Sequence, residues 1–314
     1  MGCLPLRLPF RIPRWVRLAL IGLGSLIAVL ALAAGGFWLY FHPDIDRTNG
    51  IVYGQRNGRP LTMDILRPKH PNGLGIALMV SGGWRSKKAG ELEAWLVAPV
   101  LRAGYTVFAV CHISQPESTV MDIIDDMHRG VRFIRHHAAE YRVDPNHLGA
   151  TGGSAGGHLS LMLATRGAPG NPAAADPVDR ESSAVQAVAI FYPPTDLLNL
   201  GPSTENDGKG GPPISFAKGF GPDAQVPVRW QRIGHDSSPI FYVTPAMPPV
   251  LIYHGDADTL VPLEQSQRFQ ARAKEVGLNV PVVVHAGGKH GWTTMIFDEW
   301  AFVDWFDRYL KPAR

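Results

Sequence analysis

The sequence predicts an α/β fold with a mostly parallel central sheet and helices on both of its faces. Two observations carry this prediction. From residue 76 onward, short apolar runs alternate with longer helical segments, which is typical of parallel strands joined by crossover helices. In addition, Gly104 and Gly277 lie just past the ends of two of the helical segments, where glycine commonly ends a helix.

The predicted elements follow one another in a regular order. Strands at 51–53 and 61–66 are joined by a turn at Asn57-Gly58, a dipeptide that favours tight hairpins. The other predicted strands are 76–80, 106–110, 147–151, 185–191, 250–253 and 280–284. The predicted helices are 91–102, 120–141, 155–165, 262–276 and 295–310.

One stretch, at about 197–236, breaks the alternation. It is rich in glycine, proline and asparagine and has little periodicity. A structureless loop of this length is uncommon inside a compact domain and is usually functional or disordered. An insertion after the carboxyl end of a strand overhangs the ligand crevice of an open α/β sheet. We therefore expect a loop-rich cap over the site, with disorder as the alternative.

The first forty residues have the pattern of a membrane segment. Residues 18–41 contain no charged side chain, and a spanning helix needs about 20 residues. By the positive-inside rule, the arginines before this segment would stay in the cytoplasm. These arginines are Arg7, Arg11, Arg14 and Arg17. The expected organisation is a basic cytoplasmic leader at 1–17, an anchor at 18–41, a linker at 42–50 and a folded domain at 51–314.

Two alternatives remain for the apolar segment. A cleavable signal peptide has an apolar region of roughly 7–15 residues followed by a small-x-small site, and residues 18–30 followed by Ala31-Leu32-Ala33 fit that description. A buried core helix is the other alternative, although the segment has no polar face. The anchor and the signal peptide both place the folded domain outside the cytoplasm, either membrane-bound or secreted or periplasmic.

Composition argues against several other classes of protein. The formal net charge is only +3, and four of the arginines precede the apolar segment, so we expect no nucleic-acid surface. The two cysteines, Cys3 and Cys111, lie on opposite sides of that segment, so we expect no internal disulfide. The sequence contains no metal-spaced His/Cys cluster, P-loop or dinucleotide fingerprint. We therefore expect neither a metal nor a cofactor.

The strongest local signal is the segment Gly152-Gly153-Ser154-Ala155-Gly156. It follows the predicted strand at 147–151 and opens a helix, which is the context of a nucleophile elbow. The helix N-terminus favours negative charge beside the serine. A glycine-rich turn with an incidental serine is the alternative. The strand before the segment and the helix after it favour Ser154 as a nucleophile.

A nucleophilic serine needs a base, and the base needs an orienting carboxylate. The loop after the predicted strand 250–253 contains Asp256 and Asp258, and both qualify as the acid on chemistry alone. His290 lies after the last predicted strand and before the last helix. From there it can reach back over the sheet edge to the serine. A surface histidine is the alternative reading of His290.

Stabilisation of an oxyanion requires backbone N–H groups close to the serine. The amide of Ala155 opens the helix after Ser154 and can donate to an oxyanion. The loop after the strand 76–80 contains Gly82 and Gly83, whose small size lets their N–H groups turn towards a substrate carbonyl. A plain tight turn is the alternative for this loop.

Two tryptophans, Trp84 and Trp292, flank the predicted site in the sequence. They can line the pocket for the acyl or alcohol group, or they can simply pack against the core. Together with the overhanging insertion, they indicate a restricted pocket for a short or planar acyl group.

Five segments resemble a known family of enzymes. In chain order they read VSGGWRS, VDPNHLGATGGSAGGHL, FYPPTD, HGDADTLVP and KHGW. They resemble α/β-hydrolase esterases and lipases related to feruloyl and acetylxylan esterases, in the branch related to prolyl oligopeptidases. The resemblance runs from about residue 51 to the C-terminus and implies the α/β-hydrolase fold.

The resemblance also assigns roles to individual residues. It implies Ser154 as the nucleophile, His290 as the base and, through the HG-x-x-D-x-x-VP pattern, Asp258 and not Asp256 as the acid. One departure lies in the oxyanion loop, where the family usually has His-Gly-Gly-Gly-Trp. Here Val80 stands in place of the histidine.

These observations predict an exported serine carboxylic-ester hydrolase that works through an acyl-enzyme and is attached to a membrane by its N-terminal helix. The resemblance implies acetyl or feruloyl esters on carbohydrate. A serine peptidase of the prolyl-oligopeptidase type has the same motif order and is one alternative, although that class usually carries a large N-terminal propeller. A non-catalytic binding protein is the other, although such a protein would normally have lost one of the three catalytic residues.

Overall fold

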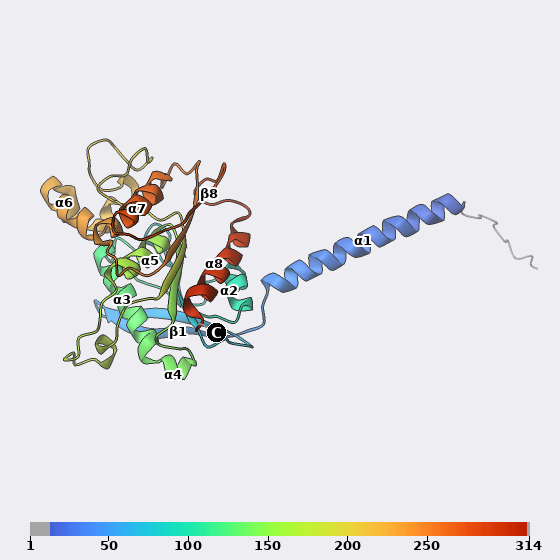
Figure 1. The fold of residues 1–314 in the computed structure, drawn as a ribbon, viewed down its shortest axis with the longest axis horizontal. Helices are drawn as coiled ribbons and strands as arrows, with labels where there is room; N and C mark the ends of the chain where they lie inside the picture. Colours follow the sequence, from blue (N-terminus) through green and yellow to red (C-terminus); the bar gives the residue numbers. More distant parts are fainter. Residues whose placement is uncertain (1–12, 313–314) are drawn as a thin grey trace, which may run out of the picture. The chain divides into compact units, whose positions relative to one another are not determined.

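The computed structural model describes residues 13–312 and divides the chain into two compact units, Met1–His42 and Pro43–Arg314 (Figure 1). Residues 1–12 of the predicted basic leader, with Arg7, Arg11 and Cys3, lie outside the described residues.

The first unit contains one long helix, α1, at Arg14–Phe41. It begins four residues before the predicted segment and directly follows Pro13, whose fixed φ suits the start of a helix. Arg14 and Arg17 therefore belong to the helix itself. By length and composition α1 is able to cross a membrane, and a signal sequence near the N-terminus has the same properties.

The second unit is built on one eight-stranded sheet with the strand order β1-β2-β4-β3-β5-β6-β7-β8. Strand β2 pairs antiparallel with β1 and β4, and all other neighbours are parallel. The strands are β1 Ile45–Arg56, β2 Arg59–Pro68, β3 Gly75–Met79, β4 Thr106–Val110, β5 Leu148–Gly153, β6 Ala187–Phe191, β7 Val250–Gly255 and β8 Val282–His285. This arrangement confirms the predicted α/β fold with a mostly parallel sheet.

Strand β1 corrects the predicted linker at 42–50. It begins at Ile45, which pairs with Pro68 of β2, so residues 45–50 belong to the sheet. This part of β1 could not be recognised from the sequence. It lies at the sheet edge, and its side chains alternate between partly buried and exposed. An edge strand of this kind does not need a continuous apolar run.

The helices differ from the predictions mainly where the backbone is interrupted. They are α2 Ala98–Arg102, α3 Val120–His136, α4 Ala138–Tyr141, α5 Ala155–Arg166, α6 Pro227–Asp236, α7 Glu264–Glu275 and α8 Met295–Leu310. The predicted helix 91–102 is reduced to a short 3₁₀ turn followed by α2, which has a proline in its first turn. A proline there lacks the N–H that would continue an earlier helix. The predicted helix 120–141 is divided at His137 into α3 and α4.

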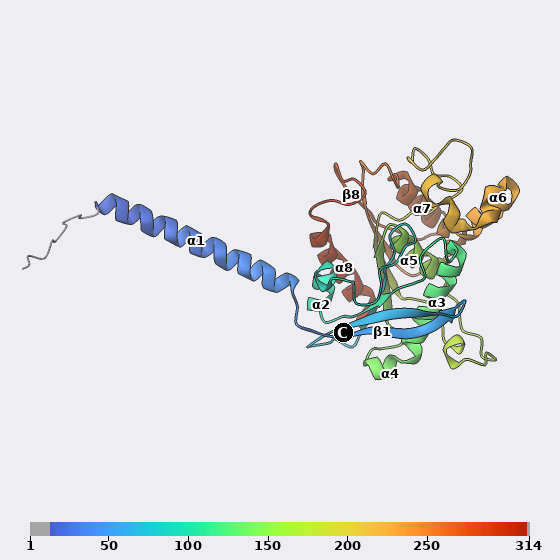
Figure 2. The ribbon, with the colours of Figure 1, turned by 180° about the vertical axis from the view of Figure 1, so that it is seen from behind.

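Two apolar cores lie against the sheet. Side chains of α3 and α5, such as Ile124 and Leu159, belong to one core, and side chains of α2 and α8, such as Val100 and Phe306, belong to the other. Figure 2 shows α2 and α8 on one side of the strands and α3 and α5 on the other. The sheet is therefore covered on both faces, as predicted.

The insertion at 197–236 has more structure than predicted. It contains two 3₁₀ helices, Ile214–Phe220 and Pro222–Gln225, and ends in α6. The Trp230 side chain of α6 is buried, and its ring lies 5.2 Å from the ring of Phe220. The alternative of a disordered insertion is therefore wrong. Packing of buried aromatic side chains orders the segment, although its sequence has no regular apolar pattern.

Candidate active site

Ser154 lies at the turn between β5 and α5, at φ 55° and ψ −122°. Residues other than glycine rarely adopt a positive φ, and such strain is concentrated at functional sites. Its glycine neighbours make the turn possible. A Cβ on Gly152 would lie 2.6 Å from the carbonyl carbon of Gly156, and one on Gly156 would collide with the carbonyl oxygen of Met79. The turn therefore holds the hydroxyl at the carboxyl end of the sheet.

The structure brings Ser154, His290 and Asp258 together in one hydrogen-bonded chain. Ser154 Oγ lies 2.8 Å from Nε2 of His290, and Nδ1 of His290 lies 2.7 Å from Oδ2 of Asp258. In the arrangement that suits both contacts, the hydroxyl donates to the imidazole and the imidazole donates to the carboxylate. These residues come from the loops after β5, β8 and β7.

The Asp258 carboxylate is buried and accepts several hydrogen bonds from protein groups. Its Oδ1 accepts hydrogen bonds from the backbone N–H groups of Leu260 and Val261, both at 3.0 Å. Burial alone would raise the pKa of Asp258, but the neighbouring His254 and His290 and the backbone donors hold that pKa well below its usual range. The carboxylate therefore stays ionised at neutral pH.

Asp256, the other aspartate of this loop, has a different environment. Its side chain is exposed, and its Oδ1 accepts a hydrogen bond of 2.7 Å from the backbone N–H of Gly287. Ala257 also donates to the carbonyl oxygen of Gly288 at 2.9 Å. Asp256 thus holds the loop that carries His290 and does not contact the imidazole itself.

The predicted oxyanion donors differ in their availability. The N–H of Gly82 donates to the carbonyl oxygen of Arg85 at 2.9 Å, so the prediction of Gly82 as a donor is wrong: the tight turn at 82–85 already uses this group. Within residues 13–312, the N–H groups of Gly83 and Ala155 have no hydrogen-bond acceptor. Both residues line the same cavity as Ser154.

The oxyanion loop is held by His112 at the point where the family histidine is missing. Nε2 of His112 lies 2.9 Å from Oγ of Ser81, the residue after Val80, and Nδ1 lies 3.0 Å from the carbonyl oxygen of Ile113. Burial lowers the pKa of His112 to about 4, so the ring is neutral at neutral pH. A neutral ring that donates from Nδ1 can accept the Ser81 hydroxyl proton at Nε2.

Trp84 lines the cavity and also packs against the insertion. It is buried, and its ring lies 5.6 Å from the ring of Phe216 and 5.3 Å from that of Phe220. Its Nε1 donates to Nδ1 of His158 at 3.2 Å. Burial lowers the pKa of His158 to about 4, which keeps that ring nitrogen free to accept. Trp84 therefore joins the oxyanion loop to both α5 and the insertion.

Trp292 does not line the cavity, and of its two possible roles the structure shows packing against the core. Its ring stacks on His285 with centroids 4.7 Å apart, and its Nε1 donates to Asp298 at 2.7 Å. These contacts join the side chain to His285 of β8 and to Asp298 of α8.

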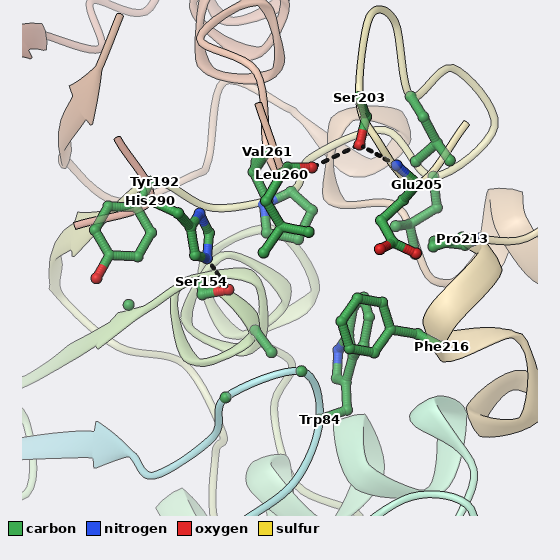
Figure 3. Close-up of a pocket in the computed structure, with 17 residues that line it drawn as sticks. Trp84, Ser154, Tyr192, Ser203, Glu205, Pro213, Phe216, Leu260, Val261 and His290 are labelled. Carbon is green, nitrogen blue, oxygen red and sulfur yellow. Dashed lines mark hydrogen bonds between the residues drawn. The ribbon is translucent and has the colours of Figure 1, made fainter. Parts of the chain in front are cut away.

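The cavity has a volume of about 390 Å³ and is lined mainly by apolar side chains (Figure 3). The insertion supplies part of its wall, as expected of a cap. These wall residues are Leu197, Leu200, Ser203, Glu205, Pro213 and Phe216. None of them was predicted, because an irregular segment gives no periodicity from which inward-facing positions can be read.

Sequence reasoning also missed Tyr192. It directly follows β6, its φ is 32°, and its ring lies 4.6 Å from that of His290. Its position offered a usable signal, because a residue immediately after a parallel strand lies at the same sheet edge as the other site loops.

Comparisons with known proteins agree with this architecture. The BD-FAE family model matches residues 63–273. Two Mycobacterium tuberculosis proteins are similar in sequence: the probable carboxylic ester hydrolase LipM (28% identical, 78% of this chain and 56% of the relative) and the esterase LipQ (30% identical, 74% and 53%). The chain thus spans about half the length of these curated relatives.

Two solved structures with similar folds illustrate the likeness. A truncated carbohydrate esterase from gut microbiota has a TM-score of 0.67 at 24% identity, covering 84% of this chain and 96% of its own. An acetyl ester-xyloside bifunctional hydrolase from Caldicellulosiruptor lactoaceticus has a TM-score of 0.65 at 21% identity, covering 82% and 95%. These likenesses show the fold. Because the family model spans well over half of the sequence, the chain belongs to the BD-FAE family of α/β-hydrolase esterases.

Proposed function

We propose that this protein is a serine carboxylic-ester hydrolase with Ser154 as nucleophile, His290 as general base and Asp258 as the orienting acid. The observation that carries the proposal is the hydrogen-bonded chain from Ser154 Oγ through His290 to Asp258, with contacts of 2.8 and 2.7 Å. The relatives named as ester hydrolases support the same reaction class.

The geometry supports a two-step reaction. Ser154 Oγ attacks the ester carbonyl while His290 Nε2 takes its proton, and the N–H groups of Gly83 and Ala155 face the oxyanion that forms. The intermediate then collapses, and His290 delivers the proton to the departing alcohol. Water attacks the acyl-enzyme in the same way, releasing the acid and restoring Ser154. Asp258 keeps the imidazole oriented and stabilises its positive charge in each step.

We further propose short-chain or carbohydrate-linked acetyl or feruloyl esters as substrates. The cavity of about 390 Å³ is near the small end of ligand sites, which range over about 300–1,000 Å³. A structural neighbour, an esterase from Thermogutta terrifontis, was solved with butyrate and with propionate bound. Acids of that length agree with a small pocket.

The substrate proposal predicts a chain-length optimum. For p-nitrophenyl esters we expect kcat/KM to peak at about two to four acyl carbons and to fall steeply by about eight. Each methylene that can be buried contributes about 0.8 kcal/mol, so an open groove would give rates that rise with length. Rates that keep rising through long chains would contradict a restricted pocket.

We also propose that α1 anchors the protein in a membrane, with the hydrolase unit outside the cytoplasm. After carbonate extraction of membranes containing the full-length protein, we expect it in the pellet, because a spanning helix resists removal by high pH.

Deletion of residues 1–41 should release a soluble and active enzyme, since every strand of the sheet lies after this segment. A mature N-terminus near Ala34 by mass spectrometry would instead establish a signal peptide.

A further inference from the structure

Glu205 stands out because it introduces a charge into an apolar cavity. Among the residues that line the cavity, Glu205 has the one carboxylate and His290 the one imidazole, and no lysine or arginine is among them. Across residues 13–312, no basic side chain lies within salt-bridge distance of the Glu205 carboxylate. Its negative charge is therefore not neutralised by the protein.

The Glu205 carboxylate is positioned by two hydrogen bonds from Ser215. Its two oxygens accept hydrogen bonds from the backbone N–H of Ser215 at 2.6 Å and from the Ser215 hydroxyl at 2.9 Å. Each carboxylate oxygen can accept a further hydrogen bond. The Glu205 side chain is thus positioned by the protein and still has free acceptor capacity.

The backbone around Glu205 is tied to the loop that carries Asp258. The N–H of Glu205 donates to Oγ of Ser203 at 3.0 Å, and that hydroxyl donates to the carbonyl oxygen of Leu260 at 2.6 Å. Thr204 donates to the carbonyl oxygen of Thr259 at 2.9 Å. The position of Glu205 relative to the proposed acid is consequently fixed by three hydrogen bonds.

Aromatic rings share the cavity with this carboxylate. Figure 3 shows the carboxylate of Glu205 directed into the cavity on the side of Phe216 and Trp84, across from Ser154 and His290. Both rings belong to the cavity lining. Aromatic faces attract cations, and the carboxylate adds a negative charge to the same part of the cavity lining. An anion in the same place would be repelled.

We propose that Glu205, with Trp84 and Phe216, makes the site selective for esters whose group inside this cavity carries a positive charge, such as an ammonium group. The inference rests on the proposed function, because it describes the part of the substrate that lies away from the reacting carbonyl. It adds a determinant of specificity that hydrolysis itself does not require.

Binding tests this inference without turnover. Full-length Ser154→Ala protein in a non-ionic detergent is titrated with choline and with 3,3-dimethylbutanol, which has the same shape without the charge. We expect choline to bind about tenfold more tightly, which is the size of effect that a partly desolvated cation–aromatic site with a carboxylate provides. Equal affinities for the two compounds would overturn the inference.

Matched variants in the Ser154→Ala background test whether Glu205 causes the preference for choline over 3,3-dimethylbutanol. Glu205→Gln keeps the shape and should lower the affinity ratio to the smaller part that the rings of Trp84 and Phe216 provide. Glu264→Gln makes the same chemical change at an exposed residue outside the cavity lining and should keep the ratio of the parent. A ratio that Glu205→Gln leaves unchanged, or one that falls equally in both variants, would refute the role of Glu205.

Kinetics distinguish failure of this inference from failure of the proposed function. With Ser154 intact, kcat/KM for acetylcholine should exceed that for 3,3-dimethylbutyl acetate by a similar factor, and Glu205→Gln should reduce the difference. Hydrolysis of both esters at equal rates would contradict the inference while leaving the esterase proposal standing. Charge-selective binding without hydrolysis of any ester would contradict the esterase proposal and support the cation site.

Discussion

Replacing Ser154 with alanine should lower kcat for ester hydrolysis by about 10⁶, the loss found when a serine protease loses its nucleophile. The expectation follows from the Ser154 Oγ contact of 2.8 Å with His290, which nothing else in the alanine variant can replace. Initial rates with p-nitrophenyl acetate, measured at high enzyme concentration, would quantify the remaining activity.

The Ser154→Ala variant should retain its fold. Ser154 adopts φ 55°, and alanine and serine are similarly disfavoured there because both have a Cβ. The thermal unfolding midpoint should therefore change little, which separates loss of chemistry from loss of structure. A variant that is stably folded and keeps activity within about tenfold of the wild type would rule out Ser154 as the nucleophile.

Replacing Asp258 with asparagine should lower kcat by about 10⁴, whereas the same change at Asp256 should cost far less. The first substitution offers an amide N–H or a neutral oxygen where the imidazole now donates to a carboxylate, and the wrong imidazole tautomer explains a loss of this size in serine proteases. Asp256→Asn keeps an oxygen that can still accept from Gly287. The two variants are therefore chemically matched controls for each other.

The pH dependence provides a second readout for this pair. Because the pKa of Asp258 lies well below its usual range, its carboxylate should stay charged through the whole acidic limb of the activity profile. That limb should therefore not report protonation of Asp258. If Asp256→Asn proves the more damaging change, the assignment of the orienting acid to Asp258 fails.

The elements that could be predicted from the sequence are those whose buried residues form a recognisable apolar pattern. Strand β4 and helix α8 have the predicted bounds, because β4 is apolar throughout and the residues of α8 form an amphipathic helix. Strand β1 was placed too late because an edge strand tolerates polar residues. Helix α6 was missed because it is short and is stabilised by tertiary packing of Trp230.

The same distinction holds at the candidate site. Ser154, His290 and Asp258 could be placed because each follows a strand end, where chain order determines position in a parallel sheet. The engagement of the Gly82 N–H with Arg85 could not be read from composition, since it depends on the conformation of one tight turn. The orientation of Trp292 depends in the same way on its tertiary neighbours.

Reaction with a fluorophosphonate, followed by mass spectrometry of the labelled peptide, tests the central claim most directly. The reagent phosphonylates an activated serine through loss of fluoride, so labelling requires a nucleophile beside a working base. We expect a single adduct on Ser154 in the wild type, slower labelling in Asp258→Asn and none in Ser154→Ala. An adduct on another serine, or equal labelling of the Ser154→Ala variant, would contradict the assignment of Ser154 as the nucleophile.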